Sequence, residues 1–306
     1  MRRIVCIFSC VAAMLLVVSG RVTAQSPCTT TLQHGDNITV FYDRYSFAEA
    51  LDAASDGDII TLSAGTFQAA NITKIVKIYG TGFSGDNLFS THIDGEIQII
   101  VSNDDDRVLY VEGVDFIDGV YWDGTLPHIS LIKCRLGYWS GSATNVFFNS
   151  CRIWDFNPGF DCKNTFLSNC VIHNMHEPYD VLSSIGIINS IVLQIEPDVL
   201  GYFKNSIIGG SVNDTLANLL TADNCIFVNI NYYERGSEKG LYSNCWRVTD
   251  SDITEIFDGV YTDIMADLDY NSFPFKLTDS AAALYIGTDS TQIGIYGGQE
   301  PYSDIP

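Results

Sequence analysis

Acidic residues dominate this chain: its 306 residues include 37 Asp and Glu against 16 Lys and Arg, which gives a formal net charge of −21 at pH 7. Such a negative field repels phosphate backbones, so it excludes nucleic acid as a partner and disfavours an anionic membrane. A chain of this length can bury a sizeable core, and disulfide bonds are not needed to hold it together.

Residues 1–24 have the features of a signal peptide. Arg2 and Arg3 precede an apolar run that is too short to be a comfortable membrane span, and Val22, Thr23 and Ala24 suit a signal peptidase. We expect cleavage after Ala24 and a secreted, periplasmic or cell-surface protein. No later stretch is long and apolar enough to be a transmembrane segment, and the mature chain is expected to be a soluble monomer.

Residues 25–43 form an N-terminal segment, and a short helix is expected just after it. Ser46 and Glu49 have the spacing of a capping box. An apolar stripe with helical spacing runs through the same stretch, made of Phe47, Ala50, Leu51 and Ala54. Because an open stack of strands invites aggregation, we expect this helix to close the first coil of the repeating fold that follows.

A short pattern repeats along the chain, in which a polar residue and then a Cys or Ser precede an apolar run. One copy is "SNCVIHN", residues 168–174. The Cys or Ser recurs at intervals of 16 to 20 residues, at positions 134, 151, 170, 190, 206, 225 and 245. A unit of this length cannot bury its apolar face alone, so neighbouring repeats must stack and share one core.

The composition of the repeats predicts strands rather than helices. Val, Ile, Phe, Asn, Ser and Gly dominate, and the LxxLxL frame of leucine-rich repeats is absent. We predict an all-β fold, a right-handed single-stranded parallel β-helix with an N-terminal capping helix, whose coils occupy residues 44–250 and whose C-terminal capping segment is residues 251–306. The Cys or Ser should point inward as a small core residue, and the preceding Asn should sit at a bend and bond to the next coil.

The cysteines fit this architectural role. Nine cysteines less Cys6 and Cys10 of the leader leave an odd number, and no CxxC pair is present. The sequence therefore supports neither a complete disulfide framework nor a zinc or redox motif. Cys162 lies off the repeated position, and its pairing with Cys28 or with another thiol stays open.

Two segments resemble a known superfamily. "EALDAASDGDIITLSAGTF", residues 49–67, resembles the opening of pectin-lyase-like right-handed β-helix proteins, in which a capping helix leads through Gly-Asp into the first coil. "FKLTDSAAALYIGTDSTQIGIYGGQEPY", residues 275–302, resembles the closing segment of exported Bacteroidetes β-helix proteins. The resemblance implies the fold more than the activity, because this superfamily includes lyases, hydrolases, esterases, adhesins and inert stalks.

Aromatic residues gather near the ends of consecutive predicted strands. They form the candidate ligand-binding set, together with two histidines: Tyr121, Trp122, Tyr138, Trp139, Trp154, His173 and His176. Flat rings suit the C–H faces of sugars, and an exposed aromatic patch marks an interaction site. We expect a platform for a polysaccharide or surface glycan, with packing beneath long loops as the alternative.

The resemblance also implies candidate catalytic residues. Polysaccharide lyases of this superfamily combine an Arg or Lys base with carboxylates that bind calcium, which suggests Arg152 with Asp155 and Asp161 here. The repeat alignment stacks Arg135 on Arg152 and turns both outward. No lyase motif matches residue by residue, and an exposed arginine ladder on an acidic surface is the simpler alternative.

Three functions remain in consideration from these residues. The first is carbohydrate binding through the aromatic face, without catalysis and with no required cofactor. The second is a polysaccharide lyase or glycoside hydrolase, for which Ca²⁺ is a possible cofactor. The third is a structural surface protein or adhesin, which needs no site at all.

Overall fold

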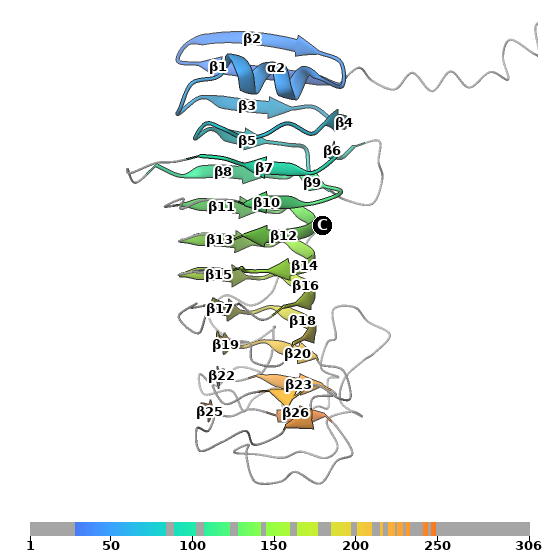
Figure 1. Cartoon of the computed structure of the whole chain (residues 1–306), viewed down its shortest axis with the longest axis vertical. Helices are drawn as coiled ribbons and strands as arrows, with labels where there is room; N and C mark the ends of the chain where they lie inside the picture. Colours follow the sequence, from blue (N-terminus) through green and yellow to red (C-terminus); the bar gives the residue numbers. More distant parts are fainter. Residues whose placement is uncertain are drawn as a thin grey trace, which may run out of the picture.

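The computed structural model describes residues 28–83, 89–101, 107–122, 128–141, 145–159, 164–176, 185–196 and 201–209, and short strand segments between 215 and 248. These residues form an all-β stack of coils, a parallel β-solenoid (Figure 1). The predicted signal peptide, Asp161, Cys162 and the C-terminal segment 251–306 lie outside the described residues. In the described part of the chain, no helix has the length and apolar character that crossing a membrane requires.

Two long sheets run along the stack. Sheet A contains, in spatial order, β2 (Asn37–Tyr42), β1 (Thr29–His34), β3 (Ile59–Leu62), β5 (Lys77–Tyr79), β8 (Leu109–Glu112), β11 (Ile129–Ile132), β13 (Val146–Asn149), β15 (Thr165–Ser168), β17 (Ile185–Ile188), β19 (Gly201–Lys204), β22 (Leu220–Asp223) and β25 (Leu241–Ser243). Every pairing in it is parallel except those that β1 makes with β2 and β3, which are antiparallel. The β1–β2 hairpin thus reverses the chain at the first end of the stack.

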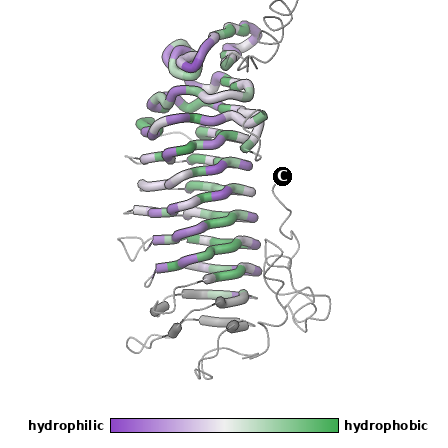
Figure 2. The backbone as a smooth tube through the Cα atoms, turned by 90° about the vertical axis from the view of Figure 1, so that its right-hand side faces the viewer, coloured by the Kyte–Doolittle hydropathy of each residue, from purple (hydrophilic) through white to green (hydrophobic). Residues whose placement is uncertain are grey.

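Sheet B supplies the second wall of each coil. It contains β4 (Gly65–Gln68), β6 (Thr91–Asp94), β9 (Asp115–Phe116), β12 (Arg135–Gly141), β14 (Arg152–Asn157), β16 (Val171–Met175), β18 (Ile191–Ile195), β20 (Ile207–Gly209), β23 (Ile226–Val228) and β26 (Trp246–Val248). Strand β10 (Val120–Trp122) pairs with β12 and with β7 (Ile97–Ile99), and β21 (Thr215–Leu216) pairs with β24 (Asn231–Tyr232). The hydrophobic stretches recur at equivalent places in successive coils (Figure 2).

The repeated polar residue forms the corner between sheets A and B. Asn169, Asn189 and Asn205 have φ angles of 48° to 54°, and Lys133 and Ser150 occupy the same position with φ of 49° and 56°. Asn tolerates this left-handed conformation better than most residues, which explains its recurrence here. The backbone N–H of each corner bonds to the next coil, as from Asn189 N to Lys204 O at 3.0 Å. The predicted bend and its link to the next coil are confirmed.

The residue after each corner lies in the core. Cys134, Cys151, Cys170, Ser190, Ser206 and Cys225 are all fully buried. The hydroxyl groups of Ser190 and Ser206 donate to the carbonyl two residues earlier, at 2.8 Å, and the thiols make the equivalent longer contacts. A small side chain that satisfies itself locally can therefore stack in coil after coil, and the inward position predicted for Cys and Ser is confirmed.

We predict that these buried thiols make the protein less stable at alkaline pH. Burial raises the pKa of the Cys134 and Cys151 thiols well above the ordinary value. Above about pH 8.5, the ordinary thiol pKa, the unfolded chain therefore ionises these groups while the folded chain keeps them protonated, and the free energy of unfolding falls as the pH rises.

Denaturant titrations at neutral and alkaline pH measure this effect. A Cys134→Ser, Cys151→Ser variant is the matched control, because Ser190 and Ser206 already occupy the same position in other coils. The loss of stability with rising pH should be smaller in the variant. Equal losses in both proteins would contradict the assignment to these thiols.

The short helix near the start of the stack is α2 (Ser46–Ala53). Its predicted apolar stripe, Phe47, Ala50, Leu51 and Ala54, is buried in the core cluster. The predicted capping box is wrong: the helix has no side-chain cap hydrogen bond. The reason is packing, because the Ser46 hydroxyl is buried and bonds to the Thr30 hydroxyl of β1 at 2.8 Å.

Candidate functional site

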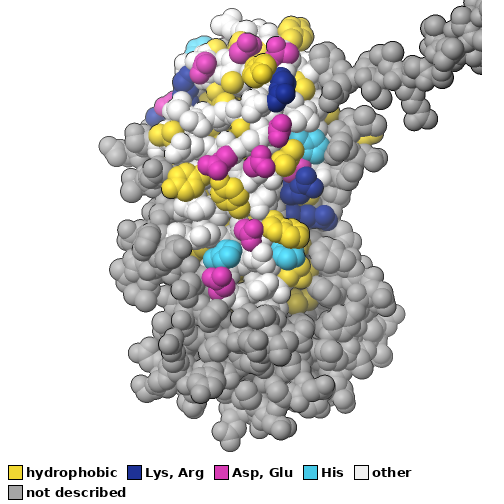
Figure 3. All heavy atoms as spheres, turned by 45° about the vertical axis from the view of Figure 1, so that its right-hand side comes forward, with side chains coloured by type: hydrophobic (Ala, Val, Ile, Leu, Met, Phe, Trp, Pro, Cys, Tyr) yellow, Lys and Arg dark blue, Asp and Glu magenta, His cyan; other side chains and the backbone are white. Residues whose placement is uncertain are grey.

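A column of charged residues crosses the outer face of sheet B. In the strand register His92 lies beside Asp115, Asp115 beside Arg135, and Arg135 beside Arg152. The stacking of Arg135 on Arg152 and their outward direction, both predicted from the repeats, are therefore confirmed. The face of the stack in Figure 3 carries basic, acidic and histidine side chains beside hydrophobic ones.

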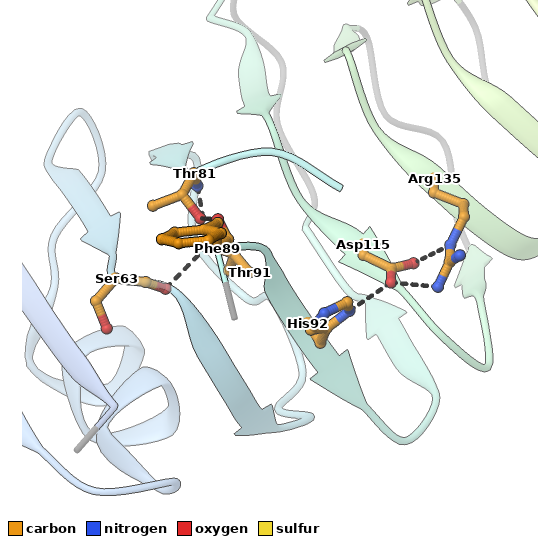
Figure 4. A network of polar contacts seen from close by, with 7 residues as sticks. All are labelled: Ser63, Thr81, Phe89, Thr91, His92, Asp115 and Arg135. Carbon is orange, nitrogen blue, oxygen red and sulfur yellow. Dashed lines mark hydrogen bonds and ion pairs between the residues drawn. The ribbon is translucent and has the colours of Figure 1, made fainter. Parts of the chain in front are cut away.

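Asp115 is the centre of this column. Its fully buried carboxylate accepts hydrogen bonds from Arg135, Nε to Oδ1 at 2.7 Å and Nη2 to Oδ2 at 2.5 Å, and lies 2.5 Å from Nδ1 of His92 (Figure 4). A bidentate arginine on a buried carboxylate is a strong, geometrically defined contact. Arg135 is thereby neutralised and held in place, while its side chain remains about half exposed.

Arg152 has a different environment. Its guanidinium carbon lies 5.8 Å from the centre of the Phe83 ring, a cation–π distance. It makes no salt bridge to any residue in the described part of the chain. Among the described residues, a carboxylate therefore holds Arg135 and none holds Arg152.

Trp154 is the exposed aromatic residue beside these arginines. Its side chain is 57 % exposed, and one face of the indole stacks on His173, with ring centroids 3.9 Å apart and planes at 15°. The position that corresponds to Trp154 on the preceding coil is Gly137. A Cβ at Gly137 would lie 2.2 Å from the carbonyl oxygen of Ile117, so no larger residue fits there. The space beside the indole is bordered by Gly137 and Ile117.

A groove of about 560 Å³ occupies this space. Its lining includes Ile117, Arg135, Gly137, Arg152, Trp154 and His173. Volumes of this size are typical of small-ligand sites, which combine apolar walls with a few polar groups. The groove offers a flat aromatic surface next to a guanidinium, an arrangement that suits a ring with polar substituents.

Two of the aromatic residues expected on the platform are buried instead. Trp122 and Trp139 are 2 % and 0 % exposed and belong to the core, so their prediction as ligand-binding residues is wrong. For Trp139, the reason is an irregular alternation of inward and outward side chains in β12. Leu136 and Trp139 both point inward with two residues between them, Gly137 and Tyr138, whereas a regular strand would alternate.

The two tyrosines of the candidate set lie at the edge of the exposed surface. Tyr121 is 38 % exposed, and Tyr138 is half-buried. Burial, with the hydrogen bond and negative charge of Glu96, raises the pKa of Tyr138 well above its ordinary value. Tyr138 therefore keeps its proton at neutral pH, and its hydroxyl donates that proton to Glu96.

His176 lies between two carboxylates beyond the Trp154–His173 stack. Its Nδ1 is 2.8 Å from Glu196 Oε1 and its Nε2 is 3.6 Å from Asp155 Oδ1. Asp155 also accepts a hydrogen bond of 2.6 Å from Asn174 Nδ2. These contacts join three successive coils and engage one oxygen, Oδ1, of the Asp155 carboxylate.

The candidate lyase residues are only partly brought together. Arg152 lines the groove, and Asp155 is on the same strand with its side chain engaged by Asn174 and His176. Asp161 lies outside the described residues. Within the described ranges, no three His, Cys, Asp or Glu side chains converge in a way that could hold a metal ion.

Sequence reasoning missed an aromatic column on the outer face of sheet A. Phe147 and Phe166 are 42 % and 41 % exposed, lie in register on β13 and β15, and stack with ring centroids 5.7 Å apart. Tyr202 of β19 follows after Gly186 in the same register. The signal was present, since these residues stand four places before the repeated Cys or Ser. Each phenylalanine ring covers one face of its neighbour, as His173 does for Trp154.

No protein-family model, curated protein or solved structure matches the chain.

Proposed function

We propose that this chain is an exported glycan-binding protein that holds a sugar ring against the open face of Trp154. The observation that carries the proposal is the groove of about 560 Å³ between Gly137 and Trp154, with Arg152 at its side. A sugar offers a C–H face to the indole and hydroxyl groups to the guanidinium. The binding set is thus narrower than the one expected from sequence: Trp154, His173 and Arg152, without Trp122 and Trp139.

The same proposal includes the finer description of the fold. We assign the solenoid to the right-handed, pectin-lyase-like type, because parallel crossovers are almost always right-handed and because residues 49–67 resemble the opening of those proteins. The β1–β2 hairpin and α2 would then serve as the N-terminal cap. Residues 1–24 would direct export, as their charged and apolar parts suggest.

The test is binding of the purified protein to a panel of neutral and uronate polysaccharides, measured by affinity electrophoresis and calorimetry. We expect Trp154→Ala to weaken binding by about tenfold or more, because an aromatic contact contributes roughly 0.5–1.5 kcal/mol beyond the area it buries. Trp154→Phe should retain part of the affinity. Phe147→Ala is the matched control, since it removes an exposed ring from sheet A, 42 % exposed against 57 % for Trp154.

Two results would count against glycan binding at this groove. One is an absence of binding to every polysaccharide tested. The other is unchanged affinity in Trp154→Ala together with a loss in Phe147→Ala, which would move the binding surface to sheet A.

The position of Arg152 favours a second candidate function, a polysaccharide lyase. Its guanidinium lines the groove without a salt bridge to any described residue, so it could approach a uronate directly. Incubation of the same polysaccharides with and without Ca²⁺ tests this function through the absorbance of unsaturated products. Product that forms with the native protein and not with Arg152→Ala would support the lyase, whereas binding without product would leave the first proposal in place.

A further inference from the structure

The first strand in the stack has an open edge. Strand β2 is the terminal strand of sheet A and pairs on one side with β1, through six consecutive residue pairs from Thr29–Tyr42 to His34–Asn37. On its other side it pairs with no described strand. An edge of this kind presents a row of unpaired backbone N–H and C=O groups that can template another strand.

Three of the usual protections are missing from this strand. Exposed edge strands are commonly blunted by charged residues, by proline or by a bulge. Strand β2, with sequence NITVFY, contains no charge and no proline, and its register with β1 is continuous. In a chain with 37 acidic residues, a six-residue edge without charge is a place where two copies can approach with little repulsion.

The same strand exposes an apolar stripe. Ile38, Val40 and Tyr42 alternate along β2 and are 67 %, 41 % and 63 % exposed. Tyr45, just before α2, is also more than half exposed. Because alternate residues of a strand share one face, Ile38, Val40 and Tyr42 form a continuous surface next to the open edge.

We propose that the occupant of this edge is a second copy of the chain, which adds its own β2 in antiparallel orientation. A two-fold axis at Val40 sets Val40 opposite Val40 of the second copy and Ile38 opposite Tyr42, so each member of the stripe meets an apolar partner. The two sheets A then continue through the interface as one sheet. The protein is a head-to-head dimer, in contrast to the monomer expected from sequence.

Charges at the two ends of the strand agree with this register. Asp36 precedes β2 and is exposed. Just after the strand come Asp43, which is also exposed, and Arg44, which is about half exposed, lies 3.8 Å from Asp94 and donates to Gln68. In the antiparallel pairing, Asp36 of one copy falls opposite Arg44 of the other, at a strand end where Asp43 and Arg44 balance each other's charge. Parallel addition would instead bring like charges together, which favours the antiparallel arrangement.

The dimer should be weak and dependent on concentration. Two six-residue strands bury less than the roughly 1,600 Å² of a standard interface, so we expect a dissociation constant of about 1–100 μM. Light scattering coupled to size-exclusion chromatography, on the full protein purified after export, should show the mass rising from monomer to dimer across that range. A monomeric mass throughout overturns the proposal.

Two variants test the position of the interface. Val40→Lys sets two like charges opposite each other and should leave a monomer at every concentration, while Phe147→Lys on the outer face of sheet A should still dimerise. A dimer that persists in Val40→Lys would place the interface elsewhere and overturn the proposal. Circular dichroism verifies that both variants fold.

Cross-linking tests the register independently. Val40→Cys lies on the proposed two-fold axis, so mild oxidation should convert it to a disulfide-linked dimer, because paired residues on adjacent strands come within disulfide distance. Ile38→Cys faces Tyr42 of the second copy and should not cross-link, and the unmodified chain controls for Cys28. Equal cross-linking of the two variants would contradict the proposed pairing.

Discussion

Replacement of Trp139 by alanine is expected to lower the free energy of unfolding by about 3–5 kcal/mol. The indole is fully buried and meets the Phe148 ring edge-on, with centroids 5.1 Å apart. Phe148, on β13, in turn packs against Phe156, on β14. Truncation at Trp139 therefore leaves a cavity at the centre of an aromatic cluster, which a close-packed interior cannot fill without rearrangement.

Trp139→Phe is the matched control for this prediction. The Nε1 group of Trp139 is buried without a hydrogen-bond partner in the described residues, so phenylalanine removes an unsatisfied donor while keeping most of the apolar volume. We expect a much smaller loss of stability than in Trp139→Ala. Chemical denaturation followed by circular dichroism measures both. A Trp139→Ala protein of native stability would show that the ring is not in the core.

The second large effect is expected at Asp115. Asp115→Ala removes the carboxylate that accepts two hydrogen bonds from Arg135 and contacts His92. Loss of one partner of a buried ion pair costs about 3–5 kcal/mol, and we expect a value near the lower end because the Arg135 side chain is about half exposed and can be rehydrated.

A double-mutant cycle with Arg135→Ala isolates this contact. If the two side chains stabilise each other, the double variant should be less destabilised than the sum of the single variants. Asp115→Asn, which keeps one oxygen acceptor, should fall between the native protein and Asp115→Ala. Additive single effects, measured by denaturant titration, would contradict the ion pair. Because Arg135 lines the groove, the same variants should also alter ligand affinity if the groove binds a glycan.

Trp154 and Trp139 show why the candidate site could be only partly predicted. Both tryptophans follow repeated positions of similar sequence, which predicts the same exposed platform for both. Trp139 follows Cys134 by five residues and Trp154 follows Cys151 by three, a difference that decides which one points outward. In each of these strands, two consecutive side chains point outward and interrupt the alternation of inward and outward residues. No local sequence pattern predicts this interruption.

The sequence alone determined the repeating architecture, because it depends on local choices made once per coil. A corner residue that tolerates positive φ, a small Cys or Ser behind it and an apolar strand after it are each visible at intervals of 16 to 20 residues. Their agreement across many repeats specifies stacked parallel coils.

Only the tertiary structure decided which side chains meet. The Asp115 cluster joins His92, Asp115 and Arg135 from three coils, and the groove is likewise lined by residues of successive coils, such as Ile117, Gly137 and Trp154. The aromatic column of sheet A and the open edge of β2 likewise depend on strand register. The physical reason is that a contact between coils links residues about 20 positions apart, so it is set by the register and by the inward or outward direction of each strand, which the local sequence specifies weakly.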